Sequence, residues 1–596
     1  MASDPGRGTA HGCGRLLCLA LLWLLALPAS KVLAQAPAGE DEPQLIQAEV
    51  TALGPGGVML LPAIRLTLNQ AVAQFYQQRS FEPAWQDDHR IDTLLGALHE
   101  LSLDGLDPED YRAGDIDHGR GALAGTASQR ADFDLLATRS YLLALTHLYR
   151  GKVDPRDFDP GRNFDARQLD PTQGLQVALA AVGDGDIASA FARARPQHPL
   201  YRGLREAMGS LRDVAGRGGW PQLPDGPTLK PGITDPRVPL LRRRLIDAGY
   251  LPTDLAVEAL DSPDYDPQLT AAVIRYQSEQ YLGADGAIGP ATRAALNVPV
   301  EARIEQLRVN EERARWLLHE VQNKLVVVDI AGYKLHYFSG TANPAAQPPE
   351  QNATAAATTA ASTAPDPQAP IDMQSQAPAT GGEMPAWSTR VQVGKPYRMT
   401  PVFKSAIDEI TFNPAWVVPP TIYLKDILPK VRGNRAYLAA NRLHVFDAQW
   451  REVSPQSVDW NKPPAGLRIR QEAGPGGALG RIKISFPNPY AVYLHDTPHP
   501  ELFDREARAF SSGCIRVQQP YDLAERLFDD PVRWNRAAID AAVAEGSTRT
   551  YKLARPVTVL LAYWTVDLHE NNRPAFKSDI YNLDAPLLKA LNRPPR

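Results

Sequence analysis

Apolar residues recur at helical spacing through the first part of the chain. The segments 71–78, 92–99 and 133–148 each show apolar side chains three and four positions apart, the pattern of a helix with one buried face. Asp-Pro pairs stand between them as turn or helix-start signals. We therefore predict that residues 63–215 form one mostly α-helical domain.

A smaller helical unit is predicted over residues 232–300. An amphipathic helix over 237–251 ends near Gly249, and a second helix leads through a Gly-rich turn to a third that begins at Pro290. Proline just inside a helix start and glycine just past a helix end are typical of helix termini. The pattern predicts a three-helix module, followed by a charged connecting helix over 301–323.

Alternation of apolar and polar residues replaces helical spacing from Lys324 onwards, and short runs of this kind are typical of β-strands. We predict a β-rich, sandwich- or barrel-like catalytic domain over 324–596, and a multidomain α+β architecture for the chain. Residues 413–460 within it are a candidate lid. The predicted strands are 325–330, 333–338, 389–394, 406–412, 444–446, 467–470, 482–486 and 491–495, with helical segments at 421–442 and 521–528 and a final hairpin from 556–566 and 574–581.

Two stretches have too little apolar bulk to bury a core. Residues 35–62 are rich in Ala, Pro, Gly and acidic residues and predict a flexible lead-in. Residues 340–387 are rich in Ala, Thr, Pro and Gln and predict a disordered insert. Because loop-closure entropy grows slowly with length, such an insert interrupts a domain without ending it.

The first 34 residues have the order of a secretory signal peptide. Arg7 and Arg15 precede an apolar run over 16–27, and small residues follow up to Ala34. The run is shorter than the roughly 20 residues of a membrane span. We predict export with cleavage after Ala34 or Ala36 and no stable membrane insertion. The net charge of −5 gives no indication of nucleic-acid binding.

The number and positions of the cysteines indicate one reactive thiol. Cys13 and Cys18 lie in the predicted leader, so Cys514 is the one thiol of the mature chain. A lone cysteine in an exported protein cannot form an internal disulfide, and this favours a reactive nucleophile over an inert buried thiol. His495 lies 19 residues before it.

The residues around Cys514 suit acyl transfer. An imidazole such as that of His495 favours thiolate formation near neutral pH. Backbone N–H groups of Ser512, Gly513 and Cys514 are candidates for an oxyanion hole, because Gly513 allows a tight turn. No residues show metal-ligand spacing, so we predict neither metal nor cofactor.

Two motifs, "YLHDTP" at 493–498 and "RAFSSGCIRV" at 508–517, resemble the catalytic motif of the L,D-transpeptidases, which have the YkuD-type fold. The stretches "ITFNPAWVVPPTI", "NPYAVYLHDTP" and "LAYWTV" resemble the large Gram-negative subfamily of the YcbB type. In the 232–300 unit, "LRRRLIDAGYL", "AVIRYQ" and "ADGAIGPATRAALN" resemble the peptidoglycan-binding-domain-1 module. Ser512 departs from the broader pattern, in which many members carry histidine.

This resemblance implies that Cys514 is the nucleophile and His495 the general base and then acid. It makes Tyr493 and Arg516 candidates for substrate contact or for orienting the site, with purely structural roles left open. It also implies that the helical domain over 63–215 is a scaffold domain. It implies 3→3 cross-linking of peptidoglycan stem peptides with release of D-alanine, in the periplasm of a Gram-negative bacterium, in cell-wall biogenesis and cell shape. Carbapenem-type β-lactams are expected to acylate Cys514. Two alternatives stay open: an L,D-carboxypeptidase or muropeptide hydrolase with the same Cys/His pair, and a non-catalytic peptidoglycan-binding scaffold.

Overall fold

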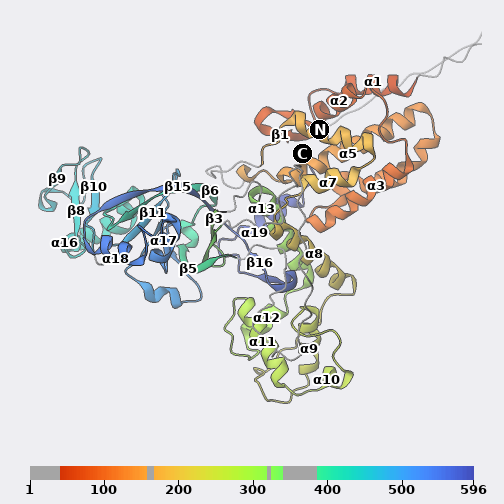
Figure 1. Ribbon diagram of the computed structural model, residues 1–596. Coiled ribbons are helices and arrows are strands. Elements are labelled where there is room, and N and C mark those ends of the chain that lie inside the picture. Colours follow the sequence, from red (N-terminus) through yellow and green to blue (C-terminus); the bar gives the residue numbers. More distant parts are fainter. Residues whose placement is uncertain (1–40, 158–166, 319–323, 340–384, 475, 596) are drawn as a thin grey trace, which may run out of the picture.

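A computed structural model of the chain describes residues 41–157, 167–318, 324–339, 385–474 and 476–595 (Figure 1). A helical domain, a smaller helical module and a β-rich domain surround a central group of elements that includes α8, α13, α19 and β16. The architecture is therefore the predicted multidomain α+β one. The predicted leader and nearly all of the predicted insert at 340–387 lie outside the described residues.

The N-terminal domain is helical, as predicted, and its long central helix is α5 (Ala127–Arg150). Thr67 and Thr126 start α2 and α5 with capping boxes, in which each threonine side chain accepts an N–H three residues later. The other elements are α1 (Glu42–Ala52), β1 (Met59–Leu61), β2 (Leu66–Thr67), α2 (Leu68–Gln78), α3 (Asp88–Glu100), α4 (Ala113–Gly119), α6 (Pro171–Asp184) and α7 (Ile187–Ala194).

The expected flexible lead-in over 35–62 is wrong for its described part. Helix α1 buries Ile46 and Val50 in the core of the helical domain, and its Glu42 forms an ion pair with Arg130 of α5. The composition did not predict this helix, because its apolar residues are few. They nevertheless lie on one face and pack against the core.

Helices α8 (Pro199–Gly216) and α13 (Val300–Leu317) share one hydrophobic core with the β-rich domain. The fully buried Arg315 of α13 donates to Glu312, to the hydroxyl of Tyr201 and to the carbonyl of Asp104. Arg315 and Glu312 are buried as an ion pair, which offsets part of the cost of burying their charges. The predicted scaffold region at 63–215 thus ends in a helix whose buried face belongs to the shared core.

The small module contains α9 (Val238–Asp247), α11 (Pro267–Glu279) and α12 (Pro290–Leu296), the three predicted helices, plus the short α10 (Val257–Asp261) that the pattern did not predict. Buried Gln277 holds the turn before α12. Its side chain accepts from the N–H of Gly286 and donates to the carbonyl of Ala287 and to Thr292.

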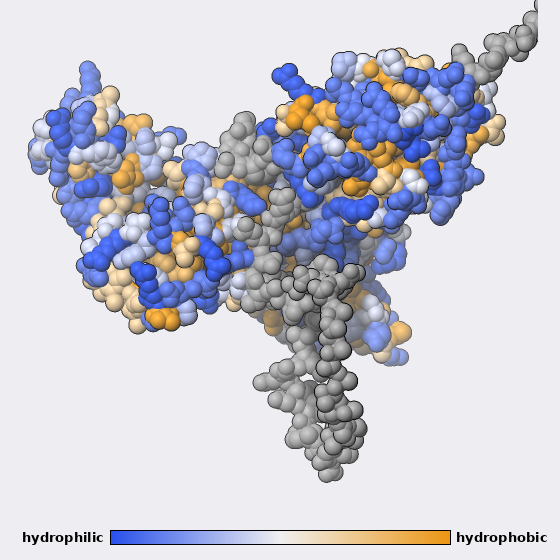
Figure 2. Space-filling view, turned by 45° about the horizontal axis from the view of Figure 1, so that its top comes forward, coloured by the Kyte–Doolittle hydropathy of each residue, from blue (hydrophilic) through white to orange (hydrophobic). Residues whose placement is uncertain are grey.

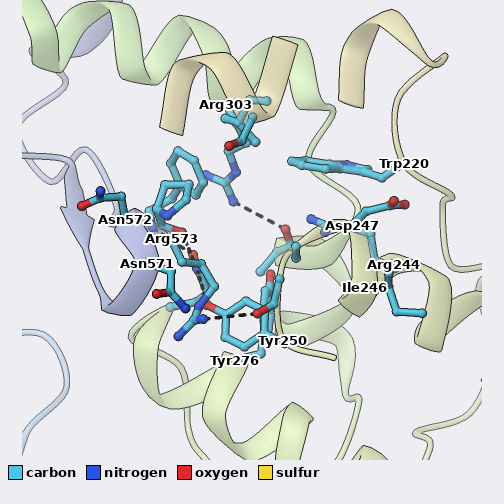
Figure 3. Close-up of a pocket in the computed structure, with 18 residues that line it drawn as sticks. Trp220, Arg244, Ile246, Asp247, Tyr250, Tyr276, Arg303, Asn571, Asn572 and Arg573 are labelled. Carbon is cyan, nitrogen blue, oxygen red and sulfur yellow. Dashed lines mark hydrogen bonds between the residues drawn. The ribbon is translucent and has the colours of Figure 1, made fainter. Parts of the chain in front are cut away.

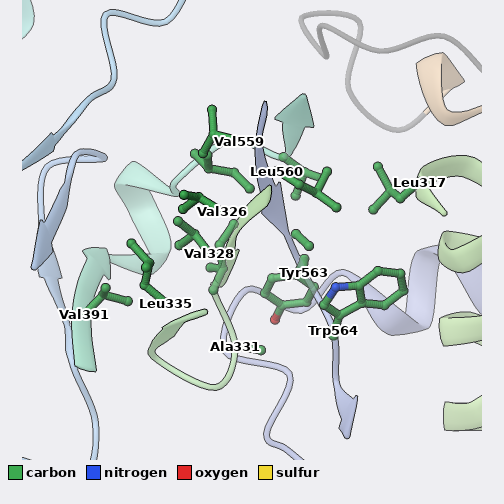
Figure 4. Close-up of a cluster of buried hydrophobic side chains, with 14 of the residues drawn as sticks. Leu317, Val326, Val328, Ala331, Leu335, Val391, Val559, Leu560, Tyr563 and Trp564 are labelled. Atoms are coloured by element: carbon green, nitrogen blue, oxygen red, sulfur yellow. The ribbon is translucent and has the colours of Figure 1, made fainter. Parts of the chain in front are cut away.

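The β-rich domain is a closed barrel. Among the described residues, the main sheet has the order β13-β5-β14-β12-β11-β6-β15-β3-β4, and β4 also pairs with β5, which closes the ring. Figure 4 shows part of the core, with Val326, Val328 and Leu560 from adjacent strands. The barrel strands are β3 (Lys324–Asp329), β4 (Lys334–Ser339), β5 (Trp387–Gly394), β6 (Phe403–Phe412), β11 (Ile482–Ser485), β12 (Leu494–His495), β13 (Ala509–Ser511), β14 (Ile515–Val517) and β15 (Arg549–Ala562).

A smaller unit projects from the barrel between β6 and β11; we call residues 416–471 the side subdomain. It has its own apolar core around Val431, Trp460 and Ile469 and its own sheet, in the order β7-β10-β8-β9. Its elements are β7 (Trp416–Val417), α14 (Pro420–Ile422), the π-helical η8 (Tyr423–Ile427), α15 (Leu428–Gly433), α16 (Ala436–Ala440), β8 (Leu443–Phe446), β9 (Glu452–Val453) and β10 (Arg468–Gln471).

The C-terminal part differs from the predicted hairpin. Strand β15 inserts between β6 and β3 of the barrel, and the hairpin consists of β16 (Val566–Leu568) and β17 (Pro574–Phe576). The remaining helices are α17 (Pro520–Phe528), α18 (Arg536–Ala544) and α19 (Asp584–Leu591). The visible surface in Figure 2 is mainly hydrophilic with separate smaller hydrophobic patches. No described helix combines the length and apolar character that crossing a bilayer requires.

Candidate active site

Two short parallel strands bring the predicted site residues together. Strand β12 pairs with β14 so that Leu494 lies opposite Ile515 and His495 opposite Arg516. Leu494 and Ile515 are fully buried in the barrel core. Because side chains alternate along a strand, Tyr493, His495, Cys514 and Arg516 lie on the other face. The sheet register thus places the sequence-predicted histidine and cysteine on one face as diagonal neighbours.

The same face carries a row of polar residues across the sheet. Lys483 of β11 lies opposite His495, and Gln392 of β5 lies opposite Arg516. Arg516 donates from Nη1 to Oε1 of Gln392 at 3.2 Å, while its buried Nε has no hydrogen-bond partner among the described residues. The site is therefore positively charged next to the thiol.

The turn before Cys514 is held by the Ser511 side chain. Its Oγ donates to the carbonyl of Cys514 at 2.5 Å and accepts from the N–H of Gly513 at 3.0 Å. Gly513 has φ +117°, a conformation that favours glycine. The Gly513 N–H, one of the predicted oxyanion donors, is therefore already engaged. Within the described chain, the N–H groups of Ser512 and Cys514 donate to no acceptor.

The thiol of Cys514 is partly exposed, and its Sγ lies 3.8 Å from the carbonyl oxygen of Ala491. Burial raises the pKa of Cys514, and the backbone and hydroxyl of Tyr493, then Arg516 and Lys483, counteract this increase only in part. The thiol is therefore protonated at neutral pH, so the site does not hold a resting thiolate.

His495 is buried, and its Nδ1 donates to the carbonyl of Asp496 at 2.5 Å. This bond fixes the tautomer that leaves Nε2 as the basic nitrogen. Burial, together with charge repulsion from Arg516 and Lys483, lowers the pKa of His495 to about 3. The imidazole is thus neutral at neutral pH, with Nε2 as its unprotonated nitrogen. Among the described residues it forms no direct hydrogen bond with Cys514.

Residues distant in sequence support the turn from behind. The Thr400 hydroxyl donates to the carbonyl of Gly513 and accepts the N–H of Gly394. The Tyr581 hydroxyl donates to the carbonyl of Gly394 at 2.7 Å and accepts the N–H of Thr400. A Cβ at Gly394 would lie 2.1 Å from the carbonyl oxygen of Arg398, so only glycine fits there.

The side subdomain contacts the site at two points. Asp426 in the π-helical η8 forms a bidentate ion pair with Arg398, and Arg398 also donates to the hydroxyl of Ser512 at 2.8 Å. Trp416 of β7 lies close enough to the side chain of Tyr493 to lower its pKa slightly against the larger increase caused by burial. The candidate lid region therefore approaches the site through Asp426 and Trp416.

Sequence reasoning missed Thr400, Arg398 and Tyr581, because none carries a recognisable motif. Lys483 could have been found, since it is the charged residue of an alternating strand. Among the residues that the structure describes, there is no group of three His, Cys, Asp or Glu side chains that could hold a metal ion.

Three known families match successive parts of the chain. Residues 70–208 match the family described as "Scaffold domain", residues 234–296 the "Putative peptidoglycan binding domain" and residues 376–533 the YkuD family, described as "L,D-transpeptidase catalytic domain". A Haemophilus influenzae protein named "Putative L,D-transpeptidase" is 36% identical over 200 residues. The match spans 33% of this chain and 40% of that relative's length, so it covers well under two thirds of the relative.

The barrel, its Cys/His face and the matched segments agree with the resemblance stated from the motifs. The chain carries an L,D-transpeptidase catalytic domain of the YkuD type and a peptidoglycan-binding domain behind an N-terminal scaffold domain.

Proposed function

We propose that this protein is a periplasmic L,D-transpeptidase that forms 3→3 cross-links in peptidoglycan through a Cys514 acyl-enzyme. One observation carries the proposal: Cys514 shares a sheet face with a neutral histidine and lies beside the N–H groups of Ser512 and Cys514, which have no acceptor among the described residues. These are the nucleophile, base and oxyanion donors that acyl transfer needs.

In the first step, Nε2 of His495 takes the thiol proton as Sγ of Cys514 attacks the carbonyl carbon of the L-centre of diaminopimelate. The N–H groups of Ser512 and Cys514 stabilise the developing oxyanion. The C–N bond to the terminal D-alanine then breaks, and the imidazolium returns its proton to the leaving amine. The product is a thioester and free D-alanine.

In the second step, the side-chain amine of another stem peptide attacks the thioester. His495 accepts a proton from that amine and delivers it to the departing sulfur, which restores the thiol. Arg516 has no carboxylate partner within the described chain, which supports a role in pairing with a stem-peptide carboxylate. Tyr493 touches both the thiol and the side subdomain and is proposed to orient the thiol.

We assign the side subdomain the role of a lid. Water that reaches the thioester would hydrolyse it, so cover over the site favours the amine acceptor. The alternative activity, an L,D-carboxypeptidase or muropeptide hydrolase, needs only that water wins this competition. The contacts of Asp426 and Trp416 with the site favour the transpeptidase.

The deciding experiment incubates the purified mature protein with a disaccharide-tetrapeptide and identifies the products by mass spectrometry. Cross-linked dimers lacking one D-alanine, absent from Cys514→Ala, are expected. Tripeptide as the sole product would establish the carboxypeptidase instead. Absence of turnover, with sacculus binding retained, would establish the non-catalytic scaffold.

Two single variants, one at each of two neighbouring histidines, test which residue is the base. His495→Ala is expected to lower the acylation rate by about 10²- to 10⁴-fold. His499→Ala is the control, because His499 is an exposed imidazole a few residues away that pairs with Glu501. Equal losses in both variants would reject His495 as the base. Acylation of Cys514 by a carbapenem-type β-lactam, read as a mass increase, provides the acylation signal.

A further inference from the structure

A cavity of about 340 Å³ lies at the junction of the small helical module, α8, α13 and the C-terminal hairpin (Figure 3). Its walls come from four places in the sequence, including Ser210 of α8, Tyr250 beside α9, Arg303 of α13 and Phe576 of β17. Because the small module supplies only part of this lining, the cavity exists only where the parts of the chain meet. We call it the junction pocket.

Three arginines line the junction pocket, each stacked on an aromatic ring. Arg244 lies over Trp220 at 3.7 Å, Arg303 over Phe576 at 4.4 Å and Arg573 over Tyr250 at 4.6 Å. Cation–π contacts of this kind hold a guanidinium flat and leave its edge for hydrogen bonding. Figure 3 shows the three arginines entering from different elements.

The positive charge of the junction pocket is not balanced from within. Arg573 pairs with Glu279, but Arg244 and Arg303 have no carboxylate ion-pair partner among the described residues. Arg244 is 3% exposed, and its Nη1 has no hydrogen-bond partner there. Burial lowers the pKa of Arg244 to about 10, and the nearby Tyr276 and Asp247 counteract this decrease only in part.

Burying the Arg244 guanidinium without an ion-pair partner is costly, and an anion that binds between it and the half-buried Arg303 would recover part of this cost. The one acidic lining residue, Asp247, forms no ion pair among the described residues, and burial raises the pKa of its carboxyl group. Tyr250, Tyr276 and Phe576 add apolar surface beside the charges. Polar groups in an otherwise apolar cavity of this size are typical of a site for a small organic ligand.

We propose that the junction pocket binds a carboxylate-bearing segment of a peptidoglycan stem peptide, with the carboxylate between Arg244 and Arg303. This rests on the proposed function for the choice of peptide, whereas the carboxylate chemistry follows from the arginines. Since α13 and β17 complete the site, the proposed ligand binds the assembled chain and not the 232–300 module alone.

The rim of the junction pocket is built for close packing. Asn571 and Asn572 both adopt left-handed conformations, at φ 58° and 54°, and Asn572 donates to Glu206 of α8. A Cβ at Gly203 would lie 2.5 Å from Leu568, so glycine allows α8 to approach the hairpin. Left-handed asparagines and a glycine in close contact are typical of places where the surrounding packing dictates the backbone conformation.

The test uses the mature Cys514→Ala chain and a disaccharide-tetrapeptide that carries a photoreactive group. After irradiation, labelled positions are mapped by mass spectrometry. Label within 246–250 or 571–576 is expected, and label confined to the neighbourhood of residue 514 would overturn the proposal. The same peptide with amidated carboxylates is expected to label the junction pocket at least tenfold less, and equal labelling would overturn the carboxylate assignment. Citrate is expected to compete only weakly; full competition would identify a free small carboxylate as the ligand instead.

Single-residue variants distinguish the loss of a charge from the loss of folding. Arg303→Gln is expected to lower labelling of the junction pocket at least tenfold, and Asp247→Asn to increase it. The control is Arg243→Gln, which removes an exposed arginine of α9, the helix that carries Arg244 and Asp247, and this arginine pairs with Asp261. Ser210→Trp, at an exposed rim position, is expected to block the cavity without a charge change. Loss of labelling in Arg243→Gln equal to that in Arg303→Gln would overturn the proposal.

Parallel turnover of the wild-type chain distinguishes the two proposals. Cross-linked products without label at the junction pocket would reject only this inference. Label at the junction pocket without turnover would reject only the proposed catalytic function.

Discussion

The ion pair between Arg398 and Asp426 is the most direct link between the side subdomain and the nucleophile turn. Asp426 accepts from both terminal nitrogens of Arg398, at 2.5 and 3.0 Å, and the same arginine donates to Ser512. If the side subdomain is a lid, this pair holds it closed. Asp426→Asn keeps the side-chain size, removes the charge and leaves the contact between Arg398 and Ser512 in place.

The strength of this ion pair is judged from the exposure of its two side chains. The side chains of Arg398 and Asp426 are 19% and 40% exposed, so solvent screens the pair. We therefore assign it about 1 kcal/mol despite its bidentate geometry. Such a change corresponds to about a fivefold shift in the balance between closed and open forms. The ratio of hydrolysis to cross-linking of the acyl-enzyme is expected to rise by up to about fivefold.

The assay measures tripeptide and cross-linked dimer from one reaction, so that differences in enzyme concentration cancel. Arg451→Gln is the matched control, because it breaks an exposed ion pair with Asp447 in the same subdomain. A double-mutant cycle of Asp426→Asn with Arg398→Gln isolates the coupling between the two residues. Strictly additive effects on the product ratio, or an equal change in Arg451→Gln, would refute the reasoning.

Three further predictions concern single residues. Ultraviolet titration of wild type against Cys514→Ala is expected to show thiolate only above pH 9.0, the ordinary thiol value, because burial raises the pKa of Cys514; full thiolate at neutral pH would contradict this. Tyr581→Phe leaves two buried partners unsatisfied and is expected to cost about 2 to 4 kcal/mol by chemical denaturation, whereas an unchanged midpoint would show that the hydroxyl is dispensable. Burial raises the pKa of Glu311 well above 4.5, so its stabilisation is complete below that pH and is lost as pH rises towards the folded-state value. Glu311→Gln is therefore expected to flatten the dependence of the thermal midpoint on pH, and an unchanged slope would show that Glu311 does not cause it.

The sequence predicted what local pattern and motif control. Helical spacing located α2, α3 and α5, and alternation located most strands of the barrel. The pairing of β12 with β14 was not predictable, because both strands are too short for their register to be read from alternation. The motifs nevertheless contained Cys514 and His495, and the sheet brings them to one face.

The missed features all depend on contacts between distant segments. The helical pattern over 421–442 gave no sign of the π-helical turn at η8, which precedes Pro429 and places Asp426 against Arg398. The occupied N–H of Gly513 depends on the rotamer of Ser511, which a motif does not encode. Protonation states also escaped prediction, because burial of His495 and Cys514 is a property of the folded chain.

The C-terminal segment connects the two sites proposed for this protein. Arg573 lines the junction pocket, Lys577 forms buried ion pairs with Asp329 of the barrel and Asp567, and Tyr581 holds the backbone behind the nucleophile turn. This segment lies beyond the matched catalytic family, which ends at residue 533. A ligand between Arg244 and Arg303 would therefore bind against the same segment that supports Gly394 and Thr400. Coupling between the two sites would be measured as a change in the acylation rate of Cys514 when Ser210→Trp blocks the junction pocket, and an unchanged rate would show that the sites act independently.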